Sequence, residues 1–185
     1  MQDNYVLHTS FTEAEDLIEP VLLTEMKTYL RISPDETFND ALVTQLIKTA
    51  RQQLEGYLNI SLVDKTVTAR LQNEIGYMQL PYSAPSITIT EVTDDDDNVI
   101  DSDNYKLKGN MLSVYSTPTA INNFYSGCSI ATVVYDVAYP DGLPEHYKTA
   151  IMQQVSWLYE RRGDEMDRAL SPLVKISLKP YRRVA

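Results

Sequence analysis

The stretch "SPDETFNDALVTQLIKTARQQLEGYLN", residues 33–59, decides the fold. Its apolar residues recur about once per helical turn, which is typical of a helix that buries one stripe in a core. The stripe comprises Phe38, Leu42, Leu46, Ala50, Leu54 and Leu58, widened by Val43, Ile47 and Tyr57. The opposite, polar face carries Lys48, Arg51, Gln52 and Glu55. The sequence therefore predicts a long amphipathic helix over 36–59 that stops at Asn59.

Three further helices are predicted around this one. "LLTEMKTYLRI" (22–32) precedes it, and "LPEHYKTAIMQQVSWLYERRGD" lies much later, with an expected helix over 144–162. "SPLVKISLKP" (171–180) has proline at its expected first helical position, where the missing N–H is not needed. We expect four helices in total.

Between residues 61 and 139 the periodicity changes from helical to alternating. Segments rich in Val, Ile, Thr and Tyr are separated by Pro, Gly, Asn and Asp, as in antiparallel strands joined by turns. The expected strands are 62–71, 86–92, 104–108, 111–115 and 129–137. Gly109 and Asn110 suit the turn of a tight hairpin between two of them.

These segments predict an α+β protein, a small helical bundle of about four helices with an antiparallel β insertion of about five strands. Residues 1–19 are polar and acidic without clear periodicity, and we interpret them as an N-terminal arm. Residues 20–183 then form a single domain. Its parts are a helical segment (20–60), the β insertion (61–139), the long helix (140–163) and a C-terminal tail with a short helix (164–185).

Composition narrows the class of protein. The 185 residues carry a net charge of −10, which argues against a general nucleic-acid binder because duplex affinity comes largely from neutralising phosphates. No apolar run is long enough to span a bilayer, and the N-terminus lacks the pattern of a signal peptide. Cys128 is the only cysteine, so no intramolecular disulfide is expected, and the protein is predicted to be cytosolic when made.

Candidates for chemistry are few. "DDDDNVIDSD" (94–103) suggests a calcium loop, but that motif requires Gly where Val99 stands and Glu where Tyr105 stands. We interpret it as a solvated turn. The histidines, His8 and His146, and the single cysteine show no catalytic signature. The sequence predicts no enzyme, no cofactor and no metal.

Charge is distributed unevenly between the two ends of the chain. All charged residues before Lys27 are acidic, and the last 18 residues carry only positive charge. The basic residues of that tail are Arg168, Lys175, Lys179, Arg182 and Arg183. Lys175 and Lys179 share a face if the short helix forms, and Tyr181 adds an aromatic anchor. A basic tail of this kind either complements the chain's own acidic surface or docks on an acidic partner, with contact to the DNA backbone as the second functional alternative.

Four stretches, in this order and spacing, resemble one protein family. They are "EPVLLTEMKTYLRI", "LVTQLIKTARQQLEGYL" leading into "SLVDKTVT", "VVYDVAYPDGLPEHYKTAIMQQVSWLYERRG" and "LKPYRR". The chain is similar, over about residues 19–183, to the head–tail connector proteins of tailed bacteriophages, also called head-completion or adaptor proteins. The arm over 1–18 is longer than the usual start of the family.

The resemblance implies a structural virion protein at the head–tail junction, present in the host cytoplasm before assembly. Such a protein would form a homo-oligomeric ring beneath the portal, matching the portal's symmetry, complete the DNA-filled head and offer a platform for the tail. The implied partners are the portal protein, neighbouring copies and a stopper or tail-completion protein. Genomic DNA would pass through the lumen without sequence-specific contact, and no membrane is involved.

We place portal or inter-subunit docking on the tail. The docking residues are Lys175, Lys179, Tyr181, Arg182 and Arg183, and a partner-facing acidic set is Glu13, Glu15, Asp16 and Glu19. Two alternatives remain open. One is an acidic metal-binding module or hydrolase that uses residues 94–97, and the other is a tail-side neck or completion protein.

Overall fold

The computed structural model describes residues 5–13, 17–72, 77–114, 130–161 and 169–182. The described chain is α+β, as predicted, with four α-helices and antiparallel strands. It divides into two compact units. One is a helical unit from residues 17–63 and 141–184, and the other is a β unit from residues 1–16 and 64–140.

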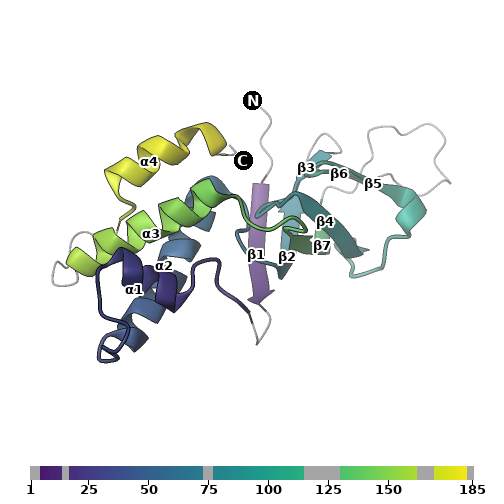
Figure 1. Ribbon diagram of the computed structural model, residues 1–185. Helices are drawn as coiled ribbons and strands as arrows, with labels where there is room; N and C mark the ends of the chain where they lie inside the picture. The colour runs from purple at the N-terminus through teal and green to yellow at the C-terminus, as the bar shows by residue number, and fades with distance from the viewer. Residues whose placement is uncertain (1–4, 14–16, 73–76, 115–129, 162–168, 183–185) are drawn as a thin grey trace. The chain divides into compact units, whose positions relative to one another are not determined.

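The helical unit contains α1 (Leu23–Tyr29), α2 (Asp40–Leu58), α3 (Glu145–Glu160) and α4 (Pro172–Leu178), shown in Figure 1. A single turn of 3-10 helix, Lys179–Tyr181, follows α4 directly. Each predicted helix is present within a few residues of its expected bounds. None of the helices in the described part of the chain has the length and apolar character that crossing a membrane requires.

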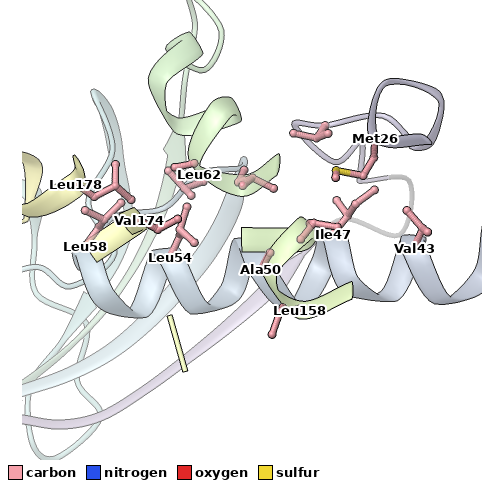
Figure 2. Packing of buried hydrophobic residues seen from close by; sticks show 14 of the residues in the cluster. Met26, Val43, Ile47, Ala50, Leu54, Leu58, Leu62, Leu158, Val174 and Leu178 are labelled. Carbon is pink, nitrogen blue, oxygen red and sulfur yellow. The ribbon is translucent and has the colours of Figure 1, made fainter. Parts of the chain in front are cut away.

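Helix α2 organises the core of this unit. Its buried apolar residues, Val43, Ile47, Ala50, Leu54 and Leu58, are spaced by three or four positions and therefore lie along one face. Figure 2 shows Met26 of α1 against one end of this face, and Val174 and Leu178 of α4 against the other. Asn59 ends the helix with a left-handed backbone (φ 55°), and its N–H donates to the Glu55 carbonyl.

The start of α2 differs from the prediction. Phe38 was expected in the buried stripe, but it precedes the helix and is 93% exposed. The reason lies in Lys27, a buried residue of α1 whose Nζ donates to the carbonyls of Pro34 and Glu36. These contacts hold residues 33–39 as a loop, so the first helical turn begins only at Asp40.

The β unit contains two antiparallel sheets. The larger has the strand order β1-β2-β7-β4, and the smaller has the order β3-β6-β5. The strands of the larger sheet are β1 (Tyr5–Glu13), β2 (Lys65–Gln72), β7 (Ile130–Ala138) and β4 (Ser86–Thr93). Those of the smaller sheet are β3 (Tyr77–Gln79), β6 (Met111–Val114) and β5 (Tyr105–Lys108). All five predicted strands are present.

Buried and less buried side chains alternate along the strands that form the core of the β unit. Val67, Ala69 and Leu71 of β2 are buried and their neighbours along the strand are not, which is the pattern of a sheet with one covered face. Tyr135 of β7 is buried as well, and its hydroxyl donates to the Pro81 carbonyl. Burial raises the pKa of Tyr135, so the phenol stays neutral.

Two features of the strands were not predicted in full. Residues 5–13, assigned to the N-terminal arm, form β1 and pair with β2 at the edge of the larger sheet. The short strand β3 was not expected either.

The predicted hairpin is confirmed, because Lys108 pairs with Met111 across Gly109 and Asn110. Of these two turn residues, only Gly109 has a positive φ, 63°.

Candidate docking surface

Helix α4 is attached to the helical unit by one apolar side. Val174 and Leu178, one turn apart, are buried in the core cluster beside α2 (Figure 2). The backbone is fixed at the start of the helix, where the Ser171 N–H donates to the buried Oε1 of Gln154 in α3 at 2.9 Å. The Tyr57 hydroxyl donates to the Lys175 carbonyl at 3.3 Å. The helix is therefore docked firmly and presents a defined outer face.

The turn after α4 is held by aromatic contacts. The Tyr181 ring stacks on His146 at the start of α3, with centroids 4.4 Å apart and planes at 24°. The Arg182 guanidinium lies over the Tyr57 ring, 5.2 Å from its centroid. Part of the predicted anchor is thus used within the chain, while Tyr181 still exposes nearly half of its surface.

The outer face of α4 combines apolar and basic side chains. Leu173 is 60% exposed and Ile176 is 72% exposed, and Lys175 and Lys179 are exposed beside them. We call these four residues the C-terminal face. The two lysines were predicted from their spacing, whereas the two apolar residues were not. The available signal was the three-residue spacing of Leu173 and Ile176, which places both on one side of the helix, away from the buried Val174 and Leu178.

A face of this kind suits a protein partner. Exposed apolar side chains that gain from burial lie beside cations that attract carboxylates. Arg183, the last of the predicted docking residues, lies outside the described residues.

The residues of the predicted acidic set belong to different parts of the described chain, Glu13 to the β unit and Glu19 to the helical unit. Glu13 ends β1 opposite Lys65 of β2, and Glu15 and Asp16 lie outside the described residues. Glu19 requires a correction. Its carboxylate is only 21% exposed and accepts two hydrogen bonds from Arg51, at 2.8 and 3.1 Å, so its charge is used within the helical unit.

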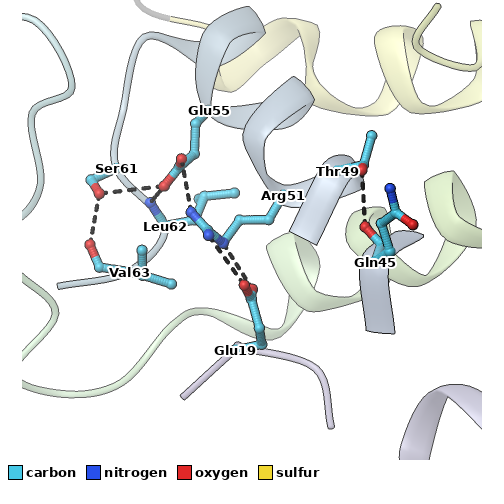
Figure 3. Close-up of polar contacts among 8 residues, drawn as sticks. All are labelled: Glu19, Gln45, Thr49, Arg51, Glu55, Ser61, Leu62 and Val63. Atoms are coloured by element: carbon cyan, nitrogen blue, oxygen red, sulfur yellow. Dashed lines mark hydrogen bonds and ion pairs between the residues drawn. The ribbon is translucent and has the colours of Figure 1, made fainter. Parts of the chain in front are cut away.

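Figure 3 shows the ion-pair network around that arginine. Arg51 and Glu55 were expected on the polar face of α2, yet both are buried. The Arg51 guanidinium pairs with Glu55 at 3.1 Å as well as with Glu19. Glu55 also accepts from the Leu62 N–H at 2.8 Å and from the Ser61 hydroxyl at 3.4 Å. Opposite charges and backbone donors therefore compensate for the burial of three ionic groups.

The acidic stretch 94–97 is a turn after β4. Asp94 accepts from the backbone N–H groups of Asp96 and Asn98 and from the Asn98 side chain. Hydrogen bonding by the Asn98 backbone and side chain lowers the pKa of Asp94. Asp95 pairs with Arg70 of β2. Among the described residues, no group of three or more His, Cys, Asp or Glu side chains is arranged to hold a metal ion.

The three other residues considered for catalysis, His8, His146 and Cys128, do not come from one element. His146 stacks against Tyr147 and Tyr181 in the aromatic contacts described above. His8 is part of strand β1, and Cys128 lies outside the described residues.

Part of this chain matches the model of a known protein family. Residues 20–103 match the family model of the phage gp6-like head–tail connector protein. The predicted resemblance to head–tail connectors is confirmed. The match covers helices α1 and α2 and strands β2, β3 and β4. No curated protein matches the connector-like chain by sequence.

Solved structures share the fold of this connector-like chain. A chain from the neck of an empty GTA particle, with C6 symmetry, has a TM-score of 0.68 at 16% identity, covering 95% of this chain and 96% of that chain. A chain from the native gene transfer agent virion has a TM-score of 0.65 at 18% identity, with the same coverage. A third, from the native GTA neck with C12 symmetry, has a TM-score of 0.65 at 16% identity. At these identities the likeness shows a common fold.

Proposed function

We propose that this protein is a structural component of the phage neck. In this proposal it forms a ring beneath the portal, completes the DNA-filled head and provides the platform for the tail. The observation that carries the proposal is the match of residues 20–103 to the gp6-like connectors. The fold common to neck proteins of gene transfer agent particles supports it. The role is structural and requires no catalysis and no cofactor.

The charge of the chain is compatible with this position. A net charge of −10 neither neutralises phosphate nor retains it, so DNA can slide through a channel lined by such a protein.

A ring also requires head-to-tail contacts, in which one surface meets a different surface of the next copy. The C-terminal face, together with Tyr181 and Arg182, is the surface we assign to docking on the portal or on a neighbouring copy.

The experiment is head completion by the full-length protein, measured as tail joining to purified portal-bearing heads. The test variant reverses two charges of the C-terminal face, Lys175→Glu with Lys179→Glu. The matched control, Lys106→Glu with Lys108→Glu, reverses two exposed lysines of β5 and changes the net charge equally. The first variant is expected to leave heads incomplete and the control to act as wild type. Equal activity of both variants would refute the assignment of the docking surface.

The same assay addresses the alternative of a tail-side completion protein. Wild-type protein is incubated separately with portal-bearing heads and with free tails, and each is then purified. We expect it to remain with the heads. If the protein is found only on tails, its partner is a tail-side protein and the assignment to the portal is wrong.

A further inference from the structure

The loop that connects α1 to α2, residues 33–39, presents an aromatic side chain to solvent. Phe38 is 93% exposed, although a phenylalanine gains more from burial than most residues do. Asp35 and Glu36 stand beside it and are exposed as well. The loop therefore combines one apolar anchor with two carboxylates.

This loop is held by specific contacts. The Lys27 ammonium donates to the carbonyls of Pro34 and Glu36 and pairs with Asp40 at 2.8 Å. The Asn39 side chain donates to Glu36 at 2.8 Å. A loop that is already ordered loses little entropy when a partner binds its exposed aromatic residue, and such residues are typical centres of protein interfaces.

The loop and the C-terminal face lie at opposite ends of α2. Phe38 precedes the first turn of that helix, whereas Tyr57 in its last turn contacts α4. Figure 2 shows the same order, with Met26 of α1 beside Val43 and Ile47, and α4 beside Leu58. Asp40 and Tyr57 are seventeen positions apart in the helix, which corresponds to a rise of about 25 Å. The two surfaces of one chain therefore do not touch.

We propose that the 33–39 loop of one copy docks on the C-terminal face of the next copy. Phe38 would pack on Leu173 and Ile176, and the loop carboxylates would face Lys175 and Lys179. The two surfaces are complementary in both charge and apolar character, and they lie on different parts of the molecule. Contacts of this kind are heterologous and build rings. The inference rests on the proposed ring and names the contact that closes it.

Self-association of the full-length protein tests the anchor. Phe38→Ala is expected to raise the dissociation constant measured by sedimentation velocity at least about tenfold. Ile18→Ala is the matched control, because Ile18 is 78% exposed in the same unit but belongs to neither surface. The control is expected to stay within about twofold of wild type. If the two variants weaken association equally, Phe38 is not the anchor.

Cross-linking tests the pairing of the two surfaces directly. In a Cys128→Ser background, protein carrying Thr37→Cys is mixed with protein carrying Ser177→Cys and oxidised, both in solution and on portal-bearing heads. Both positions are exposed neighbours of the contact residues, so Phe38 and Ile176 are kept. The expected product is a disulfide dimer of the two different variants, with little dimer from either variant alone, because a disulfide requires Cα atoms within about 7 Å.

The outcomes separate this inference from the proposed function. Wild-type rings on heads without the mixed dimer would overturn the inference and leave the function standing. The mixed dimer in solution without rings on heads would support the inference and overturn the proposed function. Absence of association in both conditions would overturn both.

Discussion

Replacing Arg51 by methionine tests whether the buried ion-pair network stabilises the helical unit. Arg51 is buried between Glu19 and Glu55, and methionine fills similar space without charge or donors. The change leaves Glu55 buried without its cation, although the Leu62 N–H still donates to it. Removing one partner of a buried pair typically costs 3–5 kcal/mol. Because Glu19 is partly solvated, we expect the lower end, about 3 kcal/mol of unfolding free energy.

The assay is urea unfolding at neutral pH, followed by the fluorescence of the single tryptophan, Trp157, which lies in α3 of the helical unit. Stability lost from the native state lowers the midpoint without changing the slope of the transition. Gln52→Ala, an exposed neighbour on the same helix, is the control and is expected to change stability by less than about 0.5 kcal/mol. A loss below about 1 kcal/mol for Arg51→Met would refute the reasoning, since the guanidinium would then not hold the two carboxylates together.

Three further predictions use other parts of the chain. Gly56→Ala, at a helical position with open space around it, is expected to stabilise the protein by about 0.7 kcal/mol. Gly109→Ala is expected to destabilise it by about 1 kcal/mol, because φ at this residue is 63°, and thermal unfolding compares the two variants. Lys27→Met leaves two loop carbonyls without their donor, so we expect about 2 kcal/mol less stability in urea and weaker self-association. Asn98 lowers the pKa of Asp94, so the carboxylate stabilises its turn above the ordinary aspartate pKa of about 3.9; the stability difference between wild type and Asp94→Ala should shrink as the pH falls below that value.

Local periodicity was enough to predict most of the elements. Helix α2 and the strands β2 and β7 repeat their patterns over eight or more residues, and their bounds were predicted within a few positions. Strand β1 was missed because its pairing with β2 joins segments about sixty positions apart, which no local pattern reveals. Strand β1, YVLHTSFTE, also lacks the regular apolar alternation of a strand with one buried face.

Charged residues caused the main errors inside the helical unit. Arg51 and Glu55 were placed on a solvated face because charged side chains are rarely buried without partners. Glu19, which pairs with Arg51, lies thirty-two positions before it, so the network becomes visible only in the fold. Phe38 continued the four-residue spacing of α2, but the contacts made by Lys27 hold it in the loop. The exposure of Lys175 and Lys179 was predictable, since their spacing places both on one side of a short helix.

The central claim is that this protein assembles as a ring at the portal vertex. Its most direct test is electron microscopy of purified portal-bearing heads before and after incubation with the full-length protein. We expect an additional ring of density beneath the portal, with rotational symmetry, that is absent before incubation. Heads that gain no density at the portal, although the added protein is folded, would contradict the account.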